Sequence, residues 1–119
     1  MTHLDAVFSD LRAIMLPYAE ALDLKTDTST ELYLDTRHIQ KNKKALFFGA
    51  VQIKKAYVSY HLMPVYLKPE LLDGVSPELR ARMQGKSCFN FTVSEKLFLE
   101  ELAVLTKASY DSYGAQGWV

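Results

Sequence analysis

Residues 45–64, ALFFGAVQIKKAYVSYHLMP, constrain the fold more than any other stretch of this chain. Two runs rich in Phe, Val, Ile and Tyr flank Lys54 and Lys55, a pattern typical of an antiparallel hairpin. A turn of two or of four residues centred on these lysines gives the same register, which pairs Val51 with Val58. The register is therefore better determined than the turn type.

Strand alternation gives this hairpin two different faces. The dry face is expected to join a hydrophobic core and comprises Phe47, Gly49, Val51, Ile53, Ala56, Val58, Tyr60 and Leu62. The mixed face combines aromatic and polar side chains and comprises Phe48, Ala50, Gln52, Tyr57, Ser59 and His61, with Phe48 opposite His61. If the protein binds a ligand, this mixed face is the first place to look.

Length and charge narrow the class of protein. A chain of 119 residues fits one domain, residues 1–119, and can bury roughly two thirds of its unfolded surface. The 14 Lys and Arg residues equal the 14 Asp and Glu residues, so no net field favours a nucleic acid. No apolar run approaches the roughly 18 residues that a membrane-spanning helix needs. We therefore expect no nucleic-acid partner and no membrane partner.

The start of the chain and its cysteine content predict the compartment. The first residues, MTHLDAVF, lack the basic region of a secretory signal. The lone Cys88 cannot form an internal disulfide, which agrees with a reducing environment. The expected location is the cytoplasm.

The segments around the hairpin predict an α+β domain with an antiparallel sheet and a helix at each end. Apolar residues recur at helical spacing from Leu4 to Leu16, with Thr2 as a candidate N-cap and a break at Pro17. A second stripe of this kind runs from Leu97 to Ala108. Further strands are expected at residues 31–35 and 86–92, a loop at 25–30, and short helices at 17–23, 69–72 and 77–84.

A basic run, TRHIQKNKK, precedes the hairpin and carries Arg37, Lys41, Lys43 and Lys44 together with His38. One interpretation is a solvated connection between strands. The other is a clasp for a phosphate or another anion. The sequence leaves both open.

The candidate binding residues are Phe48, Tyr57, His61, Cys88 and Asn90. Aromatic side chains with a few polar anchors are the usual lining of a small-molecule site. The chain has no Gly-rich phosphate loop, no GxSxG, no HExxH and no paired cysteines, so it carries no recognised catalytic or zinc motif.

The stretches FFGAVQIKKAYVSYHLMPVY and VSPELRARMQGKSCFNF, with the closing helix, resemble the YdhG-like family of small bacterial domains of unknown function. The resemblance spans about Val7 to Tyr110. It implies a frataxin-like α+β fold with the N- and C-terminal helices packed on one face of the sheet. Some frataxin-like relatives are iron chaperones that use acidic side chains, for which the candidates here are Glu20, Asp23 and Asp27.

The leading functional hypothesis is a non-enzymatic binding module that uses the mixed face for a small ligand or a protein partner, without a cofactor. The alternative is a frataxin-like iron chaperone. A third hypothesis is a small enzyme with His61 as general base. A homodimer also stays open, because an exposed hairpin edge can pair with a second copy.

Overall fold

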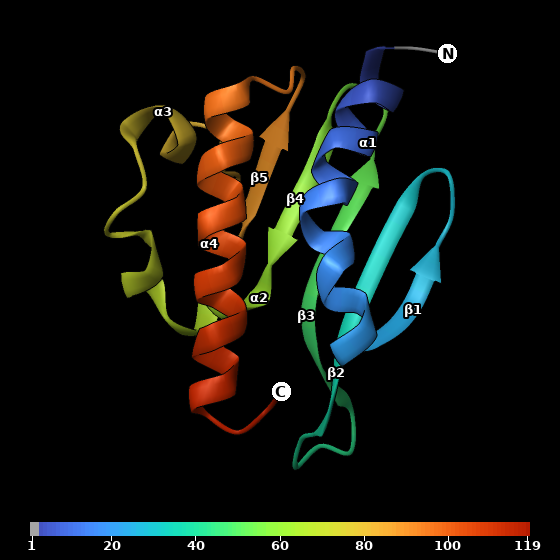
Figure 1. Ribbon diagram of the computed structural model, residues 1–119, viewed down its shortest axis with the longest axis vertical. Coiled ribbons are helices and arrows are strands. Elements are labelled where there is room, and N and C mark those ends of the chain that lie inside the picture. The colour runs from blue at the N-terminus through green and yellow to red at the C-terminus, as the bar shows by residue number, and fades with distance from the viewer. Residues whose placement is uncertain (1–2) are drawn as a thin grey trace.

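A five-stranded antiparallel sheet in the order β1-β2-β3-β4-β5 organises the computed structural model, which describes residues 3–119 (Figure 1). The strands are β1 (Asp23–Asp27), β2 (Glu31–Ile39), β3 (Ala45–Ile53), β4 (Val58–Leu62) and β5 (Cys88–Phe91). Helices α1 (His3–Met15) and α4 (Lys96–Ala115) lie side by side across one face (Figure 1). The expected α+β class, with a helix at each end of an antiparallel sheet, is confirmed.

Helix α1 ends where the sequence predicts. Its buried residues are spaced as on one side of a helix and are Val7, Phe8, Leu11 and Met15. Pro17 cannot continue the α-helical hydrogen bonds, and the chain goes on as the 3-10 helix η1 (Leu16–Ala21). The expected cap Thr2 lies outside the described residues.

The hairpin of β3 and β4 is present, but the predicted register is wrong. Ile53 pairs with Val58 and Val51 pairs with Tyr60, because the turn is closed by a hydrogen bond from Lys54 N–H to Tyr57 O at 2.7 Å. The turn thus sits one residue further along the chain than expected. The resulting register shift is even, so most residues keep their predicted face.

A β-bulge in β3 reverses the predicted faces of two phenylalanines. Leu34 pairs with Gly49 while the next residue, Asp35, pairs with Phe47, which leaves Phe48 as the extra residue. Phe48 is fully buried among the aromatic rings of the helical layer, Tyr18, Tyr110 and Tyr113. Phe47 points to the opposite face of the sheet. The expectation of Phe48 on the mixed face was therefore wrong.

Gly49, beside the bulge, is required by close packing. A Cβ at this position would lie 2.7 Å from the carbonyl oxygen of His61 and 2.7 Å from Cε of Met15. A backbone oxygen cannot move away as a flexible side chain does. Glycine at this position therefore lets α1 approach the sheet.

Polar groups within the core tie α4 to the sheet. The Tyr60 hydroxyl lies 2.7 Å from Thr106 Oγ1, which donates to Leu102 O at 2.6 Å. The Tyr113 hydroxyl donates to Phe47 O at 2.8 Å. These bonds satisfy hydroxyls that would otherwise be costly to bury.

After β4 the chain leaves the sheet in a long excursion. It forms α2 (Met63–Leu67), η2 (Pro69–Leu72) and α3 (Pro77–Arg80), which lie along the outer side of α4 (Figure 1).

Helix α3 is a single turn, shorter than the helix expected over 77–84. Strand β2 is longer than predicted, and β1 occupies part of the expected loop. Within residues 3–119 no helix is long and apolar enough to cross a membrane.

Candidate functional site

One candidate site follows from the unequal lengths of β3 and β4. Strand β3 begins at Ala45, but β4 ends at Leu62, which pairs with Gly49. Pro64 lacks an N–H and cannot extend the ladder, so the chain turns away into α2. Residues 45–48 of β3 therefore have no β4 partner, and a notch opens between them and α2.

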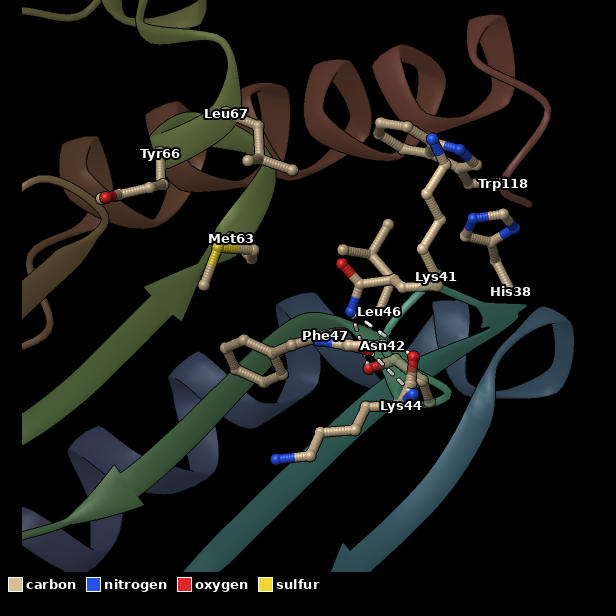
Figure 2. Close-up of a pocket in the computed structure, with 12 residues that line it drawn as sticks. His38, Lys41, Asn42, Lys44, Leu46, Phe47, Met63, Tyr66, Leu67 and Trp118 are labelled. Carbon is tan, nitrogen blue, oxygen red and sulfur yellow. Dashed lines mark hydrogen bonds between the residues drawn. The ribbon is translucent and has the colours of Figure 1, made fainter.

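A hollow of about 690 Å³ fills this notch, and we call it the basal pocket (Figure 2). Its apolar lining residues are Ala45, Leu46, Phe47, Met63, Tyr66, Leu67 and Trp118. Its polar lining residues are His38, Gln40, Lys41, Asn42 and Lys44. The volume lies within the range typical of small-molecule sites, roughly 300–1,000 Å³.

The turn that ends α4 places Trp118 in the wall of the basal pocket. Gly117 has φ 79°, and its N–H bonds to Gly114 O, while Trp118 N–H bonds to Tyr113 O at 3.0 Å. This is the glycine-dependent Schellman ending of a helix. The Trp118 ring then packs edge-on against Tyr113, with centroids 5.3 Å apart, and lies 5.8 Å from the His38 ring. Trp118 thus pins the tail to the end of α4.

The loop between β2 and β3 supplies the basic rim of the basal pocket. Lys43 N–H donates to Gln40 O, which closes a three-residue hairpin loop. Lys43 has φ 69° and is the one left-handed residue of this loop. Asn42 Oδ1 accepts from Lys44 N–H at 2.9 Å and fixes the loop (Figure 2). In Figure 2 the Lys41 side chain extends on the Trp118 side of the pocket and Lys44 extends past Phe47.

The charged side chains that line the basal pocket are all basic. No Asp or Glu is among the residues that line the basal pocket. Within residues 3–119, none of the ion pairs involves Lys41 or Lys44. The pocket therefore combines an aromatic interior with two unneutralised ammonium groups.

The open face of the sheet, on the side away from α1 and α4, adjoins this pocket through Phe47. Phe47 stacks on Tyr33 with centroids 4.7 Å apart and meets the His61 ring edge-on at 5.0 Å. His61 pairs with Cys88 across β4 and β5, and Asn90 lies beside them. Three predicted site residues, His61, Cys88 and Asn90, are thus brought together.

The chemistry of the open face is that of uncharged groups. Burial lowers the pKa of His61, and burial raises the pKa of the Cys88 thiol, so both are neutral at pH 7. His61 Nε2 lies 2.7 Å from Ser87 Oγ. Ser87 is only 8% exposed, so this bond fixes the imidazole and leaves the hydroxyl shielded from substrates.

The other two predicted residues lie apart from this group. Tyr57 is in the hairpin turn, 36% exposed, and Phe48 is in the core on the helical side of the sheet. Ala50, and not Phe48, pairs with His61, and the bulge turns the Phe47 ring to the open face, where it meets the His61 ring edge-on. A ligand on the open face would meet Phe47 and not Phe48.

The carboxylates considered for iron are not gathered. Asp23 and Asp27 occupy opposite ends of β1, about 13 Å apart along the strand, and Glu20 lies in η1. Asp27 is paired bidentately with Arg12 at 2.8 Å, and Asp23 lies 2.9 Å from Lys25 Nζ. Among residues 3–119, no group of three or more His, Cys, Asp or Glu could hold a metal ion.

The sequence pointed to only part of the basal pocket. The basic run at residues 37–44 suggested an anion clasp as one of two alternatives, and it supplies the rim. Met63, Leu67 and Trp118 were missed as site residues. The available signals were Pro64, which shortens β4, and Gly117, which turns the chain before Trp118.

A scan of protein-family models, a search of curated proteins and a search of solved structures each return no match to this chain.

Proposed function

We propose that the protein is a non-enzymatic binding domain whose basal pocket holds a small amphipathic anion. The observation that carries this proposal is the lining of the pocket, which combines Lys41 and Lys44 with aromatic residues and contains no carboxylate. An acidic head group gains a charge-assisted hydrogen bond from an ammonium group of this rim. The apolar or aromatic body of the ligand packs against Trp118 and Phe47.

The same features favour a small ligand over a polyanion. The basic side chains at the pocket rim form a local cluster on a chain whose net charge is zero, which does not favour a polyanion such as a nucleic acid. The walls come from β2, β3, α2 and the C-terminal tail, which together enclose a volume suited to a single small molecule. The lining contains no thiol and no carboxylate, which favours binding over catalysis.

Calorimetric titration with naphthalene-2-sulfonate tests this function. We expect binding in the micromolar range, and a loss of about tenfold, roughly 1.4 kcal/mol, in the Lys41→Gln/Lys44→Gln double variant. The matched control is Lys54→Gln/Lys55→Gln, which removes the same charge at the other end of β3. Equal losses in both double variants, or no heat with the wild type, would refute the proposal.

We also propose that the chain is a YdhG-like domain with a frataxin-like fold. The antiparallel sheet with α1 and α4 on one face supports this assignment, since the family is expected to place two terminal helices on one face. A cytoplasmic location is supported by the unpaired thiol of Cys88. The separation of Glu20, Asp23 and Asp27 gives no support to the iron-chaperone alternative.

A further inference from the structure

A second concave surface lies on the outer side of α4, away from the basal pocket. One hollow of about 690 Å³ is lined by α3 and the first turns of α4, and another of about 290 Å³ by the η2 to α3 connection and the middle of α4. Glu100 and Glu101 line both hollows, so the two meet there. We call this surface, from Leu97 to Ala108 and the facing residues 71–82, the α4 groove.

The far wall of the α4 groove is held rigidly. Ser76 donates to the Glu101 carboxylate from its backbone N–H at 2.9 Å and from Oγ at 2.7 Å. Ser76 Oγ also accepts from Leu79 N–H, which caps α3, and Arg80 donates to Leu72 O at 2.6 Å. The groove therefore exists before any partner arrives, which lowers the entropic cost of binding.

The floor and edge of the groove expose large apolar side chains. Leu97 is 70% exposed and Val104 is 71% exposed, although both lie on a helix that packs against a core. They are seven residues apart and so share one face of α4. Leu71, Val75, Leu105 and Ala108 continue this apolar surface along the smaller hollow.

The charges around the groove are predominantly negative. The charged side chains that line the larger hollow are four carboxylates, Glu78, Glu95, Glu100 and Glu101, and one cation, Arg82, whose guanidinium lies 5.7 Å from the centroid of the Phe98 ring. Arg80, in the same wall, is bonded to Leu72 O. Lys96 reaches Glu100 only at 3.9 Å and is 89% exposed, so solvent screens this pair strongly. An apolar floor with a carboxylate rim is complementary to a partner that is apolar on one side and basic beside it.

We propose that the α4 groove binds a basic amphipathic helix of another protein. From Leu97 to Ala108 the groove is about 17 Å long, which matches three turns of helix. Apolar anchors spaced at three, four and seven residues would fit between α4 and residues 71–82, and flanking Lys or Arg would pair with Glu78, Glu95 and Glu100. A second copy fits less well, because antiparallel pairing of two α4 helices would bring their Glu100 and Glu101 side chains together.

The test uses a fluorescein-labelled helical peptide of roughly 14 residues made of Leu and Lys, with a Leu/Glu peptide of the same pattern as the charge-inverted probe. Anisotropy should show micromolar binding of the Leu/Lys peptide and none of the Leu/Glu peptide. Leu97→Ser/Val104→Ser should weaken binding at least tenfold, and Glu100→Gln several-fold with a smaller salt dependence. Ile39→Ser and Glu20→Gln, exposed residues outside the groove, should leave affinity within twofold of the wild type.

Three results would overturn the proposal. They are the absence of binding, equal binding of both peptides, and affinity that Leu97→Ser/Val104→Ser does not change. Sedimentation of the wild type is the further check: a dimer that Val104→Ser converts to a monomer would assign the groove to a second copy instead.

Discussion

At the scale of single residues, His61 shows how burial on a sheet face sets the response of the fold to acid. Its ring meets the Phe47 ring edge-on and is hydrogen-bonded to Ser87, and His61 pairs with Cys88 of the neighbouring strand. Burial lowers the pKa of the folded imidazole below its ordinary 6.5. The unfolded chain therefore takes up a proton at a higher pH than the folded chain does.

This difference in pKa predicts that acid lowers the free energy of unfolding over a defined pH range. The contribution of His61 to stability is fully present above pH 6.5 and is lost as the pH falls from 6.5 through the lower folded pKa. Urea unfolding between pH 7.5 and 5 should show the free energy of unfolding falling in the wild type. The fall should be smaller in His61→Gln. Identical pH profiles for the wild type and His61→Gln would contradict this assignment.

At the scale of elements, the bulge in β3 separates the roles of two adjacent phenylalanines. Phe48 is fully buried under α4, so Phe48→Ala should lower the free energy of unfolding by about 3–5 kcal/mol. Phe47 is only partly buried, so Phe47→Ala should cost less, about 1–2 kcal/mol.

Binding separates the two variants further. Because Phe47 lines the basal pocket, Phe47→Ala should weaken the binding of naphthalene-2-sulfonate, while Phe48→Ala should bind normally at temperatures where it stays folded. Urea titration and calorimetry measure the two effects. A larger loss of stability in Phe47→Ala than in Phe48→Ala, or a larger loss of binding in Phe48→Ala, would contradict the bulge in β3.

The sequence predicted the elements whose patterns are local. The stripe of α1, the break at Pro17 and the apolar alternation of β3 and β4 each depend on a few neighbouring residues. Strand β1, with the sequence DLKTD, has no apolar alternation, since it is an edge strand that buries none of its residues fully. The bulge at Phe48 follows from pairing with β2, which no pattern within β3 records.

At the scale of the whole molecule, a chain of zero net charge separates its charges between two surfaces. The basal pocket is rimmed by lysines, and the α4 groove is rimmed by glutamates. Composition alone hides this separation, because it reports only the chain totals of 14 basic and 14 acidic residues. The basal pocket was equally hard to foresee, since residues 38–47, residues 63–67 and Trp118 meet only once the sheet and α4 have formed.

The emission of Trp118 is the most direct test that the basal pocket is a ligand site, because it is the only tryptophan in the chain and lines the pocket. Decanoate and 1-decanol, added at equal concentrations below their solubility limits, compare an anionic and a neutral ligand of the same length. Decanoate should shift the emission to shorter wavelength and protect Trp118 from acrylamide quenching, and 1-decanol should have a much smaller effect. Unchanged emission with both compounds, or equal responses to both, would contradict an amphipathic-anion site.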